Sequence, residues 1–265
     1  MNTLKVTSCM AGNMDFVGRA LARYLADRLA IPAEFVEDIP WPERERRLDA
    51  GEIQVAWICG LPYVRKVDQA EPPLELLVAP VMQGRRYQNR PIYFSDVVVH
   101  RDSPFHTFAE LRGASWAYNE PGSQSGYNIT CYHLATLGEF GGYFGQVIAA
   151  GAHQTSLQMI LARQVDASAI DATVLELELA LHPEIAGQIR VIDTFGPSPI
   201  PPWVISKQAP QALRETLRTL LLDMHHTPAG RAILAKARMG RFVRVEDHDY
   251  DPIREMAAQA ATVTL

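Results

Sequence analysis

The 265-residue sequence lacks the features that mark several large classes of proteins. It has only three cysteines, widely spaced and without a C-x-x-C pair, so we expect reduced thiols rather than a disulfide framework or a cysteine zinc site, although a single bridge stays open. No apolar run reaches the roughly 18 residues of a membrane span. The net charge of -5 disfavours nucleic acid as the main partner. These absences indicate a globular protein without metal or cofactor.

The N-terminus also lacks an export signal. Residues 1–8 enter a strand-like pattern directly, without the basic, apolar and small-residue regions of a signal peptide. Two interpretations stay open at this stage. The protein is cytoplasmic, or it is periplasmic and the sequence begins after a signal that has been removed.

Strand and helix patterns alternate along the first part of the chain. Strand patterns at 4–9, 33–37 and 54–59 are separated by helical patterns at 16–29 and 41–50. The last of these strands is continuously apolar, as in a parallel sheet that is covered on both faces. The order β-α-β-α-β predicts an α/β fold with a parallel sheet.

The remaining patterns predict two α/β lobes. A long strand at 92–100 leaves the first lobe, and the proline-rich segment 197–202 returns to it. We therefore predict a discontinuous first lobe, residues 1–99 plus 197–265, and an inserted second lobe, residues 100–196. Two crossing strands would form a hinge, with a ligand cleft between the lobes.

A strand-loop-helix segment in the inserted lobe has the character of an anion site. The loop at 118–127 contains Ser123, Ser125 and Gly126 at the start of a predicted helix. Free N–H groups at a helix N-terminus attract anions, hydroxyls add donors, and glycine allows close approach. The alternative is that one serine is only a helix cap. In the first lobe, the rule that ligands bind beyond the carboxyl ends of strands selects Asn13 and Tyr63.

Several segments, in this order and spacing, resemble one family. The chain is similar to the PhnD-like phosphate/phosphonate substrate-binding proteins of ABC transporters, which have the type 2 periplasmic binding protein fold. The resemblance covers most of the chain and depends on residues 55–63, 93–99, 108–113, 120–127, 152–156, 165–171 and 198–201.

The resemblance implies a set of ligand contacts. The Ser123-Gln124-Ser125-Gly126 segment would hold the oxyanion from a helix N-terminus, with Tyr127 lining the cleft or packing on the helix. Tyr93 and His153 resemble family ligand contacts, and a histidine binds an oxyanion better when it is protonated.

The chain departs from the family pattern at three positions. Gln124 stands where the family usually has threonine, which suggests a different or larger ligand. Thr173 and Pro201 stand where family members that bind amino-phosphonates have acidic residues. Asp171 could partly replace these, or could be the N-cap of the helix that follows.

Two classes of function follow. The first is a non-catalytic solute-binding protein that closes on a phosphonate, phosphate or phosphite-like oxyanion, works with an ABC transporter permease, and is a monomer or weak dimer. The second is a cytoplasmic enzyme on the same fold, similar to pyrimidine-precursor synthases or menaquinone-pathway dehydratases, with His153, Asp171 and Ser125 as its only candidate residues. A ligand-binding partner of a sensor is a third alternative.

Overall fold

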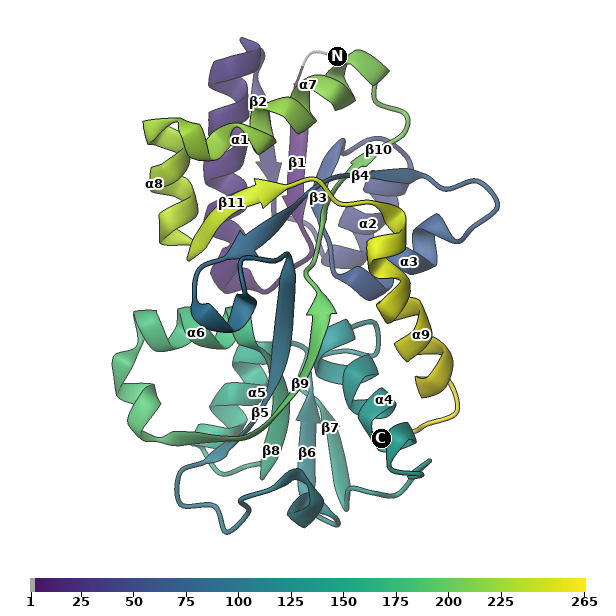
Figure 1. The fold of residues 1–265 in the computed structure, drawn as a ribbon, viewed down its shortest axis with the longest axis vertical. Helices are drawn as coiled ribbons and strands as arrows, with labels where there is room; N and C mark the ends of the chain where they lie inside the picture. The colour runs from purple at the N-terminus through teal and green to yellow at the C-terminus, as the bar shows by residue number, and fades with distance from the viewer. Residues whose placement is uncertain (1–2) are drawn as a thin grey trace. The chain divides into compact units, whose positions relative to one another are not determined.

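The computed structural model describes residues 3–265, which divide into two compact units. Unit 1 contains the described residues up to Ile92 together with Pro199–Tyr250, and unit 2 contains Tyr93–Ser198 together with Asp251–Leu265. Each unit has its own sheet with helices against it, so the predicted α/β class is confirmed (Figure 1). Within the described part of the chain, no helix combines the length and apolar character that crossing a membrane requires.

Unit 1 is built from two separate stretches of the chain. Its elements are β1 (Leu4–Ser8), η1 (Gly12–Met14), α1 (Asp15–Leu29), β2 (Ala33–Val36), α2 (Trp41–Asp49), β3 (Val55–Trp57), α3 (Gly60–Val67), β4 (Leu74–Met82), η2 (Arg85–Tyr87), β10 (Trp203–Ser206), α7 (Gln211–Leu222), η6 (Met224–His226), α8 (Pro228–Lys236), β11 (Met239–Val243) and η7 (Asp247–Tyr250).

The sheet of unit 1 is mixed rather than purely parallel. Its strand order is β11-β4-β10-β3-β1-β2. β1 runs parallel to β2 and β3 as predicted, whereas β10 is antiparallel to β3 and β4, and β11 is antiparallel to β4. β10 and β11 follow the return from unit 2, and β10 enters the sheet between β3 and β4. This pairing joins segments about 150 residues apart, which local sequence patterns do not report.

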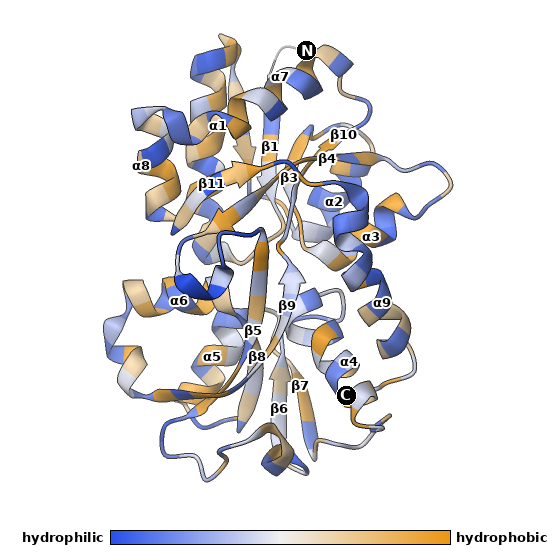
Figure 2. Ribbon diagram, viewed as in Figure 1, coloured by the Kyte–Doolittle hydropathy of each residue, from blue (hydrophilic) through white to orange (hydrophobic). Residues whose placement is uncertain are grey.

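The core of unit 1 is centred on two tryptophans from the neighbouring strands β3 and β10. The rings of Trp57 and Trp203 stack with centroids 5.5 Å apart, and Trp57 Nε1 donates to the Pro201 carbonyl at 2.9 Å. Gly18 of α1 lets the ring of Phe35 on β2 pack against the helix, because a Cβ on Gly18 would lie 2.1 Å from that ring. Figure 2 shows the strands as mainly apolar and α2, with its Glu and Arg residues, as mainly hydrophilic.

Unit 2 contains the inserted segment and the C-terminal helix. Its elements are β5 (Ile92–His100), η3 (Phe108–Leu111), β6 (Ser115–Tyr118), the π-helical turn η4 (Gln124–Asn128), α4 (Ile129–Thr136), β7 (Gln146–Ala149), α5 (His153–Leu161), β8 (Ala167–Asp171), α6 (Ala172–Leu181), η5 (Pro183–Gly187), β9 (Ile189–Pro199) and α9 (Asp251–Ala260).

The sheet of unit 2 has the order β7-β6-β8-β5-β9. β6 is parallel to both β7 and β8, and β5 is antiparallel to β8. On one face, Phe108 contacts a group of buried rings that includes Trp116, Tyr143 and Phe195. The three parallel strands end at one edge of this sheet, and each is followed by a helix or helical turn (Figure 1).

The C-terminal helix belongs to unit 2, which corrects the predicted lobe boundaries. The sequence prediction placed residues 251–265 in the first lobe, but α9 packs against α4, and Ala260 and Val263 are buried in the core of unit 2. Unit 2 also begins at Tyr93 rather than at residue 100, because β5 pairs with β8 along its length. The chain therefore passes between the units three times, not twice.

Candidate functional site

The carboxyl edge of the unit 2 sheet gathers the starts of three helical segments. β6, β7 and β8 run parallel, and they lead into η4, α5 and α6 respectively. The first N–H groups of a helix have no acceptor within the helix, and the helix dipole makes this end positive. The edge is therefore suited to an anion, independently of the negative charge of the whole chain.

The loop after β6 leads into a capped π-helical turn, η4. Ser123 is the N-cap, and its Oγ accepts from the Gly126 N–H at 3.1 Å. The Asn128 N–H donates to the Ser123 carbonyl at 2.9 Å, so the turn spans five residues instead of four. The sequence pattern predicts that a helix begins at this loop. The structure has this wide turn followed by α4, which ends at Thr136.

The two serines lie beside His153, the first residue of α5. Ser125 Oγ is 3.0 Å from His153 Nε2, and the Ser123 and Ser125 hydroxyl oxygens are 3.5 Å apart. All three side chains are buried, and His153 Nδ1 has no hydrogen-bond partner. The N-cap of α5 is Ala152, which offers no side-chain cap, so the first N–H groups of this helix remain directed at the same edge. We call Ser123, Ser125, Gly126 and His153 the oxyanion seat.

Gly126 is required by the close packing of this seat. A Cβ on Gly126 would lie 2.0 Å from Asn119 Oδ1 and 3.1 Å from His153 Cε1. The backbone of the turn therefore lies directly against the histidine and the asparagine. Asn119 follows the last residue of β6, and its Oδ1 is buried without a partner. Asn119 was not among the predicted site residues, although its place after the carboxyl end of β6 could have indicated it.

The seat offers neutral donors rather than fixed positive charge. Burial lowers the pKa of His153 to about 4, so its imidazole is neutral near pH 7. Without a ligand, the site therefore does not hold the protonated histidine that would bind an oxyanion better. Among residues 3–265, no lysine or arginine side chain is hydrogen-bonded to Ser123, Ser125 or His153.

Asp171 lies at the same edge but is engaged as a helix cap. It ends β8 and accepts from the Thr173 N–H at 2.8 Å and from the Thr173 hydroxyl at 2.7 Å. Burial raises the pKa of Asp171 to about 6, and the nearby Asp96 carboxylate adds to this rise. His153 Nδ1 does not donate to Asp171, so the Ser-His-Asp arrangement that an enzyme would need is not formed.

His153 and Asp171 predict opposite pH dependences of stability. His153 binds a proton more weakly in the folded state. Its contribution to the free energy of unfolding is therefore fully present above pH 6.5 and is lost as the pH falls towards 4. Asp171 binds a proton more tightly in the folded state, so the cost of its buried charge is relieved as the pH falls from 6 towards 3.8. Each pKa shift corresponds to a change of roughly 3 kcal/mol in the free energy of unfolding.

The test is urea unfolding of His153→Asn and Asp171→Asn variants between pH 7 and 4. Relative to the wild type, His153→Asn should gain stability as the pH falls, and Asp171→Asn should lose it. Parallel stability curves for the two variants and the wild type would contradict the assigned pKa directions. Thr155→Ala on the exposed face of α5 serves as the control.

The other predicted contacts in unit 2 occupy different positions. The Gln124 side chain is 0% exposed and bonds to Asn128 and Ser198, so it points into the interior of the unit and not into the seat. Tyr127 packs its ring against Tyr118 with centroids 5.0 Å apart. Tyr93 is buried on β5, two residues before Ser95, the residue that pairs with Asp171. The register therefore places Tyr93 at the edge that carries the seat.

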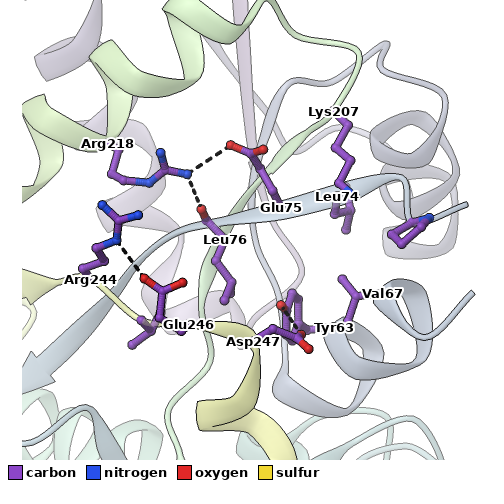
Figure 3. A pocket seen from close by; sticks show the side chains of 12 residues that line it. Tyr63, Val67, Leu74, Glu75, Leu76, Lys207, Arg218, Arg244, Glu246 and Asp247 are labelled. Carbon is purple, nitrogen blue, oxygen red and sulfur yellow. Dashed lines mark hydrogen bonds and ion pairs between the residues drawn. The ribbon is translucent and has the colours of Figure 1, made fainter.

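Asn13 and Tyr63 belong to unit 1. Asn13 lies in η1, the next element after β1. Tyr63 lies in α3, where its hydroxyl donates to Asp247 Oδ1 at 2.8 Å and its ring packs on Tyr250. It lines a polar cavity of about 360 Å³ within unit 1, shown in Figure 3. Its hydroxyl thus donates within unit 1, and its role as a ligand contact stays a prediction.

The three cysteines form no disulfide bond. Cys131 is buried in unit 2, where burial raises the pKa of its thiol to about 11. Cys9 and Cys59 are half-buried and follow the neighbouring strands β1 and β3. The predicted reduced state is therefore what the structure has, but only one of the three thiols is fully buried.

Comparison with known proteins gives the same family for most of the chain. Residues 18–250 match the family described as "ABC transporter, phosphonate, periplasmic substrate-binding protein". A binding protein component of an ABC phosphonate transporter from Pseudomonas aeruginosa has a similar structure. Its TM-score is 0.85 at 16% identity, over 98% of this chain and 87% of the other.

Two further solved structures share the fold. A PhnD protein from Prochlorococcus marinus, in complex with methylphosphonate, has a TM-score of 0.85 at 16% identity, over 99% of both chains. A Xanthomonas citri protein bound to ATP has a TM-score of 0.76 at 16% identity, over 98% of both chains. At these identities the structures show the fold alone, the two-lobe fold of periplasmic binding proteins. The family assignment comes from the match over residues 18–250, and that family consists of binding proteins, not enzymes. This chain belongs to the phosphonate-type family of periplasmic substrate-binding proteins of ABC transporters.

Proposed function

We propose that this protein binds a small oxyanion of the phosphonate, phosphate or phosphite type at the oxyanion seat of unit 2 and delivers it to an ABC transporter permease. The observation that carries the proposal is the convergence of the Ser123 and Ser125 hydroxyls with His153 at an edge where three helical segments begin. The methylphosphonate complex of the Prochlorococcus protein supports the choice of ligand class.

The chemistry of the seat suits an oxyanion with several acceptor oxygens. Hydroxyl and backbone N–H donors in a buried site form charge-assisted hydrogen bonds, which are stronger than bonds between neutral groups. The neutral His153 adds a further polar group without repelling the donors around it. Tyr93, at the same edge, is proposed as an additional contact, and Asn13 remains the proposed contact from unit 1.

The remaining parts of the proposal follow from the family. We infer a periplasmic location, because the family is described as periplasmic. We infer a monomer or weak dimer that docks on the permease in its ligand-bound form. The protein is not an enzyme, because its family consists of binding proteins. The lack of a hydrogen bond to His153 Nδ1 supports the same conclusion.

Calorimetric titration with methylphosphonate, phosphate and phosphite tests the ligand. We expect at least one of these anions to bind, and Ser123→Ala and Ser125→Ala each to weaken its binding by about 10- to 100-fold, since a hydrogen bond to a charged group contributes about 1.5–3 kcal/mol. Thr216→Ala, which removes an exposed hydroxyl on α7 in unit 1, should leave the affinity unchanged. The proposal fails if none of the three anions binds, or if both serine variants bind as the wild type does.

A further inference from the structure

Gln124 stands between the two serines of the seat, yet its side chain turns into the interior of unit 2. It is fully buried, and both of its polar atoms have partners. Its Oε1 accepts from Asn128 Nδ2 at 2.7 Å, whereas its Nε2 donates to Met256 Sδ at 3.2 Å and, over a longer 3.4 Å, to Ser198 Oγ. A buried amide whose donors and acceptor are all engaged is held in a single orientation.

The bond between Gln124 and Asn128 spans the π-helical turn. The backbone closes this turn through the Asn128 N–H and the Ser123 carbonyl, and the side-chain bond runs beside it at 2.7 Å. A π turn contains one more residue than an α turn and is less favourable without support. The side-chain bond supplies that support from within the turn.

The width of the turn decides where the donors of the seat lie. Ser123 and Ser125 flank Gln124, so a change from a π to an α turn would rotate the chain after Ser123 by one residue. Ser125 Oγ would then leave its place 3.0 Å from His153 Nε2 and 3.5 Å from Ser123 Oγ. The orientation of the donors therefore depends on a side chain that faces away from them.

The partners of the Gln124 Nε2 come from segments that adjoin two of the three chain crossings. Ser198 is the last residue of unit 2 before the chain passes to unit 1, and Met256 lies on α9, shortly after the chain returns at Asp251. The Ser198 hydroxyl also lies 3.8 Å from Met256 Sδ. One side chain thus joins the seat to both segments.

We propose that Gln124 is a positioning residue, which holds the π turn and thereby orients the Ser123 and Ser125 donors without contacting the ligand through its side chain. The expected effect of Gln124 on oxyanion affinity rests on the proposed function. It replaces the sequence-based interpretation of Gln124 as a mark of a larger ligand. It also assigns to Asn128 and Met256 a role in the site.

Gln124→Met and Asn128→Leu test the inference, because each keeps most of the side-chain volume and removes the bond across the turn. We expect each variant to weaken methylphosphonate binding by about tenfold at 15 °C, the effect of one buried hydrogen bond. The double variant should be no weaker than either single variant, since all three lack the same bond. Hydrogen exchange at the Gly126 and Asn128 amides should become faster in all three. Gln158→Met, on the exposed side of α5, is the matched control.

Three outcomes would overturn the inference. If the variants melt at lower temperature but bind methylphosphonate as the wild type does, Gln124 only packs. If Gln124→Met binds weakly while Asn128→Leu binds normally, Gln124 contacts the ligand directly. If amide exchange at residues 126 and 128 is unchanged, the side chain does not hold the turn. The exchange measurement needs no ligand, so it decides the inference even if the wild type binds none of the three oxyanions and the proposed function fails.

Discussion

Replacement of Gly126 by alanine is expected to weaken oxyanion binding by at least about 100-fold, because it misplaces two donors that each contribute about 1.5–3 kcal/mol to a charged ligand. The added Cβ would lie 2.0 Å from Asn119 Oδ1 and 2.9 Å from Asn119 Cγ, so rotation of the amide group alone does not relieve the clash. The backbone must move away from Asn119 and from the His153 ring. Either movement separates Ser125 from His153.

The same loop offers a matched control for this prediction. A Cβ on Gly122 would meet no atom within 4 Å, and Gly122 does not have the positive φ that restricts other residues. Gly122→Ala should therefore bind methylphosphonate with wild-type affinity in the same calorimetric titration. Equal affinities for the two alanine variants would show that the close packing around Gly126 does not matter for the site.

Replacement of Trp203 by alanine is expected to destabilise unit 1 by about 3–5 kcal/mol, the range for removal of a large aromatic side chain from a core. Trp203 is fully buried on β10 and stacks on Trp57 at an interplanar angle of 13°. β10 lies between β3 and β4 in the sheet, so the cavity would open where the two parts of unit 1 meet. The melting temperature should fall by roughly 10 °C.

Trp41 provides the comparison, since it is the first residue of α2 and its side chain is 42% exposed. Trp41→Ala should change the free energy of unfolding by no more than about 0.5 kcal/mol. Both variants can be followed by urea unfolding monitored by far-ultraviolet circular dichroism. A Trp203→Ala protein that unfolds at the wild-type urea concentration would show that the tryptophan pair is not central to the core.

The positions that sequence patterns predicted well are those set by local chemistry. The strand β3 and the helix α1 were predicted at 54–59 and 16–29, within a few residues of their observed bounds. The Ser123–Gly126 segment was placed after a strand and before a helix, where the structure has it. Asp171 was assigned two roles, and the structure selects the N-cap. In each case the signal lies in neighbouring residues, so it can be read without the fold.

Some side chains have partners far away in the chain that the sequence did not indicate. Tyr63 was selected because it follows a strand end, but its hydroxyl is used by Asp247, 184 residues later. Gln124 was interpreted as a ligand contact, but its amide is bound by Ser198 and Met256, which are 74 and 132 residues away. No local pattern reports such pairings, since they exist only once the segments have packed together.

The sequence by itself determined the class of fold and the family, and it placed two serine hydroxyls and a glycine at a helix start. These depend on the alternation of apolar and polar residues and on the hydroxyls and glycine of one short loop. Only the tertiary structure decided that α9 belongs to unit 2, that the seat is neutral, and that Gln124 faces inward. Burial fixes the protonation state of His153, and packing fixes the direction of a side chain. Both are properties of the surroundings of a residue rather than of the residue itself.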